Sequence, residues 1–325
     1  MTNTTSTPVD NSVDNCSAIA RYLAVALLGA IFFPVLVFIL ECFAKVNVEI
    51  KWQLPVWVGL TVPFSCLGFL KGKFCALKML AFALFFGAVT KALFVASLFY
   101  DTSADSMAYH ADAILQLLHG VNPVYEWMHG FDDSWVNAYP KATWVFASLV
   151  THLTGNYNLG KSYNLLLIYA VMAYIFSFLK AREMHTGMAC LVALAASLGP
   201  VEIAQLQTFY VDGALGSLVT LVLFSGLAML AKPRNSDKVV FIMSSCLLIN
   251  VKFTGLAYVY VLYAICACVM LYRWHKSRSP EDFSQGRMLA GCMVLVTLVG
   301  GIVMGYNPYI TNTISYHNPF FSLDW

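Results

Sequence analysis

Residues 79–123 read MLAFALFFGAVTKALFVASLFYDTSADSMAYHADAILQLLHGVNP, an apolar run that passes directly into an acidic segment. The first 21 residues contain one charged side chain, Lys91, and are long and apolar enough for a helix to cross a bilayer. The residues that follow, 100–123, carry three aspartates and no lysine or arginine. The junction therefore predicts a helix that leaves a membrane and leads into an acidic segment at its surface.

The composition of the whole chain points the same way. Of its 325 residues, 59% are hydrophobic and only 11% are charged, which is more apolar sequence than a soluble core can bury. The first apolar run, residues 17–42, is too long for the core of a signal peptide and is followed by further runs. We therefore expect an all-α polytopic membrane protein. The net charge of +2 gives no indication of a nucleic-acid partner.

Nine apolar runs are candidates for membrane-spanning helices. They are residues 18–42, 53–70, 79–99, 161–179, 187–201, 213–231, 238–250, 254–272 and 287–305. Two of them, 187–201 and 238–250, are short against the ~20 residues that a span needs. A further stretch, 139–154, is apolar enough to be considered as a tenth.

The distribution of lysine and arginine decides the orientation of these helices. The alternate loops 71–78, 180–185, 232–238 and 273–287 together hold twelve basic residues, whereas the segments on the other side hold four. Basic loops stay in the cytoplasm, so the N-terminus is expected inside and the C-terminus outside. A full span at 139–154 would reverse every later loop. We therefore predict a partly inserted helix there, at the outer surface, within one external loop of residues 100–160.

Within that loop, residues 105–119 are predicted to form an amphipathic helix that lies on the membrane. Met107, Ile114, Leu115 and Leu118 would line its apolar face, and Gly120 with Pro123 would end it. Asp105 falls at the helix start, where the free N–H groups favour a carboxylate, so it is either a cap or a reactive group. His110 is likewise either an interfacial side chain or part of a site. Glu126, Asp132 and Asp133 would otherwise form a solvated rim.

Three lysines are predicted at the outer edge of the bilayer: Lys141, Lys161 and Lys252. Each could extend its amine to the lipid headgroups along an apolar surface. Alternatively, the three cations around one acidic loop could hold the phosphate of a lipid-linked substrate. Asp212 opens another apolar run on the same side, as a cap or as a second carboxylate of that site.

Several segments in this order resemble the GT-C membrane glycosyltransferases, in the branch of lipid A aminoarabinose transferases and protein O-mannosyltransferases. In DSMAYHADAILQLLHGVNP, Asp105 and Tyr109 match the acidic residue and the following tyrosine of the family's first external loop. The other similar segments are YPKATWVFASLVTHLTGNYNLGKSYNLLL, TFYVDGALGSLVTL, INVKFTGLAYV and NPYITNTISYHNPFFSL. The resemblance covers roughly residues 79–322, and seven predicted spans fall within it.

The resemblance implies an organisation and an activity. Residues 1–75 would be a cytoplasmic tail with a two-helix extension, residues 76–305 a seven-helix GT-C module, and residues 306–325 an external C-terminal segment. Such a module transfers a sugar, with inversion, from a polyprenyl-phosphate donor to a glycan, lipid or protein acceptor of the cell envelope. It would act at the external face of a bacterial-type cytoplasmic membrane, in contact with membrane lipids.

The resemblance also implies a catalytic role for Asp105, because a carboxylate can take the proton from an acceptor hydroxyl. The expected site residues are Asp105 as base, Lys141, Lys161 and Lys252 as phosphate ligands, and Tyr109, His110, Asp132, Asp133, Tyr210 and Asp212 as supporting or substrate-contacting groups. A divalent metal is possible, with Glu126 and His129 as candidate ligands, although no tight ligand spacing is present.

Two other functions stay open. Because the chain ends at Trp325, soon after the last predicted span, it could be a short form, a fragment or a non-catalytic subunit of an envelope-glycan assembly system. It could also be a lipid or solute carrier, although its charges gather at span edges rather than at the midplane where carriers usually place them.

Overall fold

The computed structural model describes residues 8–46, 51–70, 75–130, 133–231 and 233–321, and all regular elements in these ranges are helical. The long helices are α1 (Pro8–Phe43), α3 (Cys75–Ser97), α7 (Tyr163–Lys180), α10 (Asp212–Met229), α12 (Phe253–Ser277) and α13 (Pro280–Val296), the last continued by the π-helical η4 (Thr297–Met304). These six segments are long and apolar enough to cross a membrane. The chain is thus an all-α protein with six candidate membrane spans, as expected for a multi-pass membrane protein.

The three remaining apolar runs also form helices, but shorter ones. They are α2 (Gln53–Cys66), α8 (Thr186–Ser197) and α11 (Asn235–Ile249), with 14, 12 and 15 residues. At 1.5 Å per residue they extend about 18–23 Å, less than the ~30 Å of a bilayer core. All nine runs of the sequence therefore become helices, and six of them have the length of a span.

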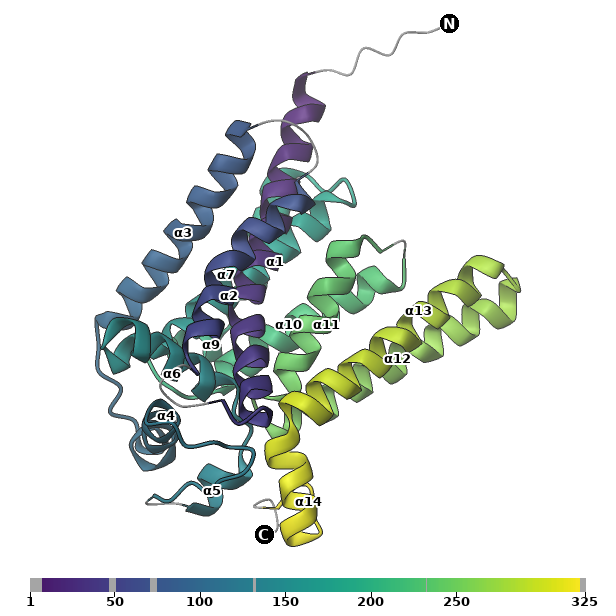
Figure 1. Ribbon diagram of the computed structural model, residues 1–325. Coiled ribbons are helices and arrows are strands. Elements are labelled where there is room, and N and C mark those ends of the chain that lie inside the picture. The colour runs from purple at the N-terminus through teal and green to yellow at the C-terminus, as the bar shows by residue number, and fades with distance from the viewer. Residues whose placement is uncertain (1–7, 47–50, 71–74, 131–132, 232, 322–325) are drawn as a thin grey trace, which may run out of the picture.

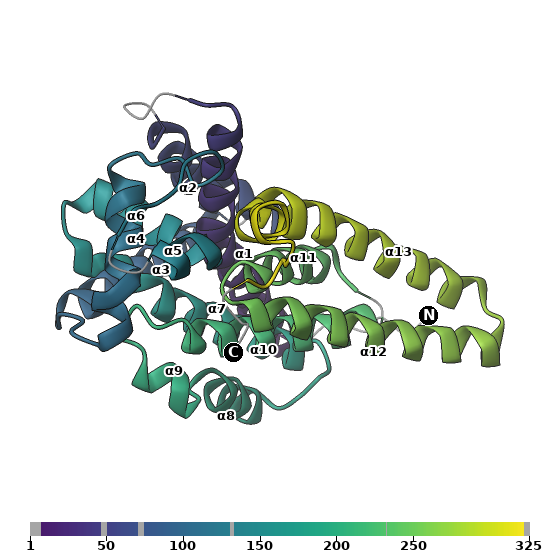
Figure 2. The ribbon, with the colours of Figure 1, turned by 90° about the horizontal axis from the view of Figure 1, so that it is seen from below.

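Helix α1 lies in the centre of the molecule, where it packs against α2, α7 and α11 (Figures 1 and 2). Its residues Tyr22, Leu28, Val35 and Phe38 are almost completely buried. The paired helices α12 and α13 lean away from this bundle in both views. They expose large apolar side chains such as Leu271, which suits a surface that faces lipid rather than water.

Short helices gather at one end of the bundle, opposite the N-terminus (Figure 1). They are η2 (Ser106–His110), α4 (Ala111–Leu118), α5 (Asp133–Ala138), α6 (Ala142–Thr154), η3 (Tyr157–Ser162), α9 (Pro200–Ala204), η5 (Tyr306–Ile310) and α14 (Thr311–Tyr316). The turn η1 (Leu67–Phe69) follows α2. Most of the predicted loop 100–160 is therefore folded into helices at the end of the molecule that also holds α14.

The amphipathic helix predicted over 105–119 forms as η2 and α4, and it ends at Leu118 as the glycine and proline predicted. Its buried face is Ala113, Ile114 and Leu117, whereas Met107 and Leu115 of the predicted face are exposed. This face packs on α6, where the Ser148 hydroxyl donates to the Ile114 carbonyl at 2.9 Å. The helix thus presents Met107 and Leu115 away from the protein, and its position on a membrane surface stays a prediction.

Helix α6 is short, as the charge distribution required, but it does not lie on the surface of the molecule. All residues from Ala142 to Thr151 are buried, under α1, α4 and η3. Most of the helix predicted at 139–154 is thus covered by other helices, and its position at the outer surface of a membrane stays a prediction.

Gly255 sets the close crossing of α11 and α12. A Cβ atom at this position would lie 2.0 Å from the carbonyl oxygen of Leu248. Since that oxygen belongs to backbone, it cannot rotate away. Any larger residue must push α12 from α11, and with it Lys252, which directly precedes α12.

We expect Gly255→Ala to destabilise the protein by about 1–3 kcal/mol through overpacking. The thermal unfolding midpoint in detergent should fall. The matched control is Gly291→Ala in α13, where a Cβ meets no atom within 4 Å. Alanine there should preserve or raise the midpoint, because it favours helix over glycine. Equal midpoints for the two variants would contradict the close crossing.

Candidate functional site

Asp105 and Tyr109 form the first half of the candidate site. The chain leaves α3 at Ser97 and turns into η2, directly after Asp105. Asp105 makes no side-chain cap bond to the helix start, so the cap that the sequence allowed is not formed. Its side chain is exposed instead, and its Oδ2 accepts a hydrogen bond from the Tyr109 hydroxyl at 3.5 Å. A spacing of four residues places both on one helix face.

Asp212, Lys252 and Gln205 form the second half. Asp212 opens α10 and Lys252 precedes α12, and the Lys252 Nζ lies 2.5 Å from the Asp212 Oδ1. The two side chains are 33% and 41% exposed, so the ion pair is only half covered. Gln205 donates through Nε2 to Asp212 Oδ2 at 3.4 Å, and its Oε1 accepts from the Gly213 amide at 2.8 Å. Gln205 thereby holds the carboxylate in place.

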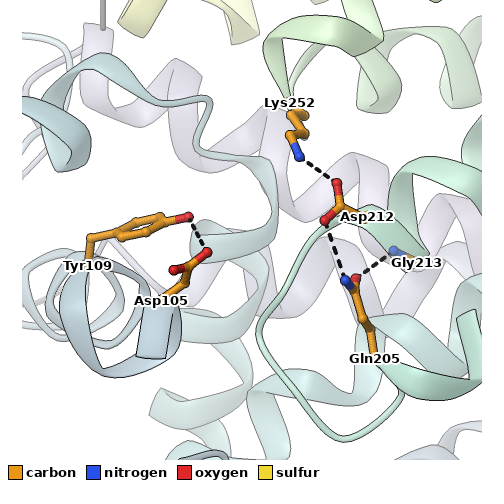
Figure 3. A network of polar contacts seen from close by, with 6 residues as sticks. All are labelled: Asp105, Tyr109, Gln205, Asp212, Gly213 and Lys252. Atoms are coloured by element: carbon orange, nitrogen blue, oxygen red, sulfur yellow. Dashed lines mark hydrogen bonds and ion pairs between the residues drawn. The ribbon is translucent and has the colours of Figure 1, made fainter. Parts of the chain in front are cut away.

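The two halves lie on facing segments, as Figure 3 shows, with the Tyr109 hydroxyl directed toward the segments that carry Lys252 and Asp212. Burial raises the pKa of Tyr109, and the negative charges of Asp105 and Asp212 raise it further. Tyr109 is therefore a neutral hydrogen-bond donor at physiological pH. An exposed carboxylate, a phenol and a partly exposed ammonium group thus lie on segments that face one another.

His110 is buried behind this face and is neutral. Burial lowers the pKa of His110 to about 3, even though the charge of Asp101 acts to raise it. The indole Nε1–H of Trp144 donates to His110 Nδ1 at 2.6 Å. Because an indole can only donate, Nδ1 must be unprotonated and the ring proton sits on Nε2. His110 thus anchors η2 to α6.

The other two predicted phosphate ligands lie elsewhere. Lys141 is completely buried, and its Nζ donates to the carbonyl oxygens of Asn137, at 3.1 Å, and of Tyr139. Burial lowers the pKa of Lys141 well below its ordinary value. Lys161 is also buried, and its Nζ donates to the carbonyl oxygen of Phe99. Of the three lysines, only Lys252 has its amine on a segment that faces Asp105 and Tyr109 (Figure 3).

The remaining predicted residues are dispersed. Tyr210 is half-buried and lies two residues before Asp212, and its backbone carbonyl accepts from the Tyr163 hydroxyl at 3.4 Å. Asp132 lies outside the described residues, and Asp133 begins α5, where its side chain is not described. Glu126 accepts from the amide of Asn122 at 2.8 Å, and His129 is exposed in the same loop. Within the described ranges, no three His, Cys, Asp or Glu side chains come together as metal ligands would.

Asp101 is a structural residue of the site that the sequence did not single out. It is buried, and its carboxylate accepts from the Ser106 hydroxyl, from the Ser103 amide at 3.0 Å and from the Phe209 amide at 2.5 Å. Burial acts to raise the pKa of Asp101, but these hydrogen bonds outweigh it and lower the pKa. Asp101 thus ties the Asp105 loop to the segment before Asp212.

We expect Asp101→Asn to destabilise the protein by about 1–3 kcal/mol, because an asparagine NH₂ would face donors that need an acceptor. Because the pKa of Asp101 is lower in the folded than in the unfolded state, its carboxylate stabilises the folded state at pH values above the unfolded pKa of ~3.9. This stabilisation is lost as the pH falls through the folded-state pKa. The midpoint difference between wild type and variant should therefore be constant from pH 7 to about 4 and shrink below it. Thermal melts at several pH values measure this, and identical melting of both proteins at pH 7 would refute it.

Protein-family models, curated proteins and solved structures show no match to this chain.

Proposed function

We propose that the chain is a membrane glycosyltransferase of GT-C type, which moves a sugar from a polyprenyl-phosphate donor to an envelope acceptor with inversion. The observation that carries the proposal is the exposed Asp105 carboxylate opposite the half-exposed Lys252. Lys252 directly precedes the long apolar helix α12, and Asp105 lies in the segment that follows α3, directly before η2. A base and a cation near the ends of such helices suit a reaction between a lipid-borne phosphate and a polar acceptor.

The chemistry assigns a role to each group. Asp105 accepts the proton of the acceptor hydroxyl, whose oxygen attacks the anomeric carbon from the face opposite the phosphate. The bond between the anomeric carbon and the phosphate oxygen breaks, and polyprenyl phosphate leaves with the electron pair. The ammonium group of Lys252 stabilises the added negative charge on that phosphate. Tyr109 orients Asp105 through its hydroxyl, and Asp212 with Gln205 orients Lys252.

The proposal includes the arrangement in the membrane. The six long helices and the shorter α2, α8 and α11 would together make nine crossings, with α3 to η4 as the seven-helix module and residues 1–75 as its extension. Twelve basic residues in one set of loops support a cytoplasmic N-terminus. The site and the C-terminal segment 306–325 would then be external to a bacterial-type cytoplasmic membrane.

The test is release of free polyprenyl phosphate by the purified protein in lipid nanodiscs. A panel of polyprenyl-phosphate sugars serves as donors, and extracted envelope glycans, lipids and proteins serve as acceptors. We expect acceptor-dependent release from one class of donor. No release from any donor by stably folded protein would favour a non-catalytic subunit or a carrier instead.

A further inference from the structure

A separate polar cavity lies at the same end of the molecule as the candidate site. Its volume is about 220 Å³, and its walls come from the loop after α4, from α5 and from η5 with α14. The lining combines the rings of Tyr125, Trp127 and Tyr316 with polar groups, among them Glu126 and Asn307. None of the roles proposed above uses this cavity.

The polar groups of the cavity include an acceptor that is not satisfied. Asn307 is 9% exposed, and its Nδ2 donates to the Pro123 carbonyl at 2.6 Å. Its Oδ1 is buried and finds no hydrogen-bond partner in the part of the chain that the structure describes. A buried acceptor left without a donor costs about 1–3 kcal/mol. The Glu126 carboxylate, held by the Asn122 amide at 2.8 Å, adds a second acceptor at the rim.

The aromatic rings of the cavity are fixed and accessible. Trp127 and Tyr125 are 43% and 53% exposed, although both are large side chains in a polar loop. The Tyr125 hydroxyl donates to the Phe43 carbonyl at 3.3 Å, which holds that ring in place. Tyr316 stacks on Phe321 with ring centroids 3.5 Å apart. Rigid, exposed rings offer a flat apolar contact at little entropic cost.

This combination selects the chemical class of the ligand. A sugar ring presents C–H groups on its faces and hydroxyl donors around its edge, which match the aromatic rings and the exposed Glu126 carboxylate respectively. The residues found to line the cavity include no lysine, arginine or histidine, but the Lys45 amine lies 4.7 Å from the centroid of the Tyr125 ring and offsets the negative charge of Glu126. The preference for a sugar over a phosphate group therefore rests on the aromatic rings. The volume is below the ~300–1,000 Å³ of drug-sized pockets, so it suits a unit of about one ring.

Helix α5 connects the cavity to the candidate site. Asn137 of α5 lines the cavity, while Trp135 of the same helix stacks on Tyr109 with ring centroids 6.1 Å apart. Tyr109 in turn donates to Asp105. One short helix thus forms a wall shared by the cavity and the Asp105 group.

We propose that this cavity binds one saccharide unit of the acceptor and so selects a glycan or glycosylated acceptor; this part of the inference rests on the proposed function. The acceptor would be anchored by one ring in the cavity, while a hydroxyl further along it reaches Asp105. The binding itself does not require turnover.

The test is saturation-transfer NMR on the full chain in nanodiscs, with methyl glycosides of glucose, galactose, mannose and N-acetylglucosamine as probes. We expect at least one glycoside to bind to wild type and equally to Asp105→Asn. Ser315→Trp, which fills the cavity from an exposed position, and Trp127→Ala should weaken binding at least ten-fold. Trp57→Ala is the control, since Trp57 of α2 is 65% exposed and does not line the cavity, so its loss should leave binding unchanged.

Each result bears on one of the two proposals. Absence of glycoside binding, or equal binding by Ser315→Trp, overturns the inference even if donor release occurs. Binding of glycerol phosphate in place of the glycosides also overturns it. Transfer at wild-type rates in both cavity variants refutes the acceptor role. Cavity-dependent glycoside binding without any donor release supports a saccharide site and defeats the proposed glycosyltransferase instead.

Discussion

Replacing Asp105 by asparagine is expected to slow sugar transfer by about 10²–10⁴-fold, the usual contribution of a general base. Asparagine keeps the size of the side chain and can still accept from the Tyr109 hydroxyl, but it cannot take a proton. The side chain is exposed and makes no cap bond, so the fold has little reason to change. The loss should therefore appear in the rate and not in the unfolding midpoint. Release of polyprenyl phosphate under saturating donor measures it.

The control for this experiment is Asp112→Asn, the same substitution seven residues later in the same helical segment. Asp112 makes no hydrogen bond to Tyr109, Lys252 or Asp212 in the described part of the chain, so its change should leave the rate within about two-fold. Because its Oδ2 is buried, the unfolding midpoint of this variant is measured as well. Equal rates for wild type and Asp105→Asn would remove Asp105 from the chemistry. Loss of activity in both variants would point to the loop as a whole and not to one carboxylate.

Replacing Lys252 by methionine is expected to lower the rate by about 10²–10³-fold, as for the loss of one preorganised group that stabilises developing charge. Methionine is an unbranched side chain one atom shorter than lysine, and it carries no charge. The Asp212 carboxylate would then face the donor phosphate without a cation, so repulsion adds to the loss. The double variant Lys252→Met/Asp212→Asn separates these contributions, because it removes both charges. It should recover part of the rate.

Lys238→Met is the control for the loss of a lysine. Lys238 lies near the start of α11, at the end of that helix away from Lys252, and its amine contacts Asn235 at 3.4 Å. The transfer rate of Lys238→Met should match that of wild type. The donor concentration for half-maximal rate should rise in Lys252→Met and stay constant in Lys238→Met. An unchanged rate in Lys252→Met would mean that another group binds the phosphate.

The sequence predicted the helices well because each signal lay within one segment. All nine apolar runs form helices, and Gly120, with φ of +96°, follows the end of the segment that began at Asp105. The pairing of Asp105 with Tyr109 is likewise a local matter of four residues on one helix face. The sequence could not show which of the three lysines would be buried in the fold and which would be exposed. Lys141 and Lys252 had equal standing beside apolar runs, yet one is completely buried and the other half-exposed.

Asp101 illustrates a second limit, which is that hydrogen bonds to distant backbone groups cannot be predicted from the sequence. Among its partners is the amide of Phe209, which is 108 positions away and carries no side-chain signal. A backbone donor cannot be recognised from the sequence, so only the folded chain identifies Asp101 as the residue that joins the Asp105 segment to the segment before Asp212. The same holds for Asn307, whose partner Pro123 lies 184 positions earlier.

The central position of α1 has a consequence for biosynthesis. Its main partners include α7, which begins at Tyr163, about 120 residues after α1 ends. At a synthesis rate of about 5–20 residues per second, α1 is made roughly 6–24 s before that partner emerges. The contacts that Ser17 and Arg21 make with Ser177, both at 3.4 Å, cannot form during this interval. During this interval α1 can pack against α2, which follows it directly, whereas the side of α1 that carries Ser17 and Arg21 stays without its partner until α7 has been made.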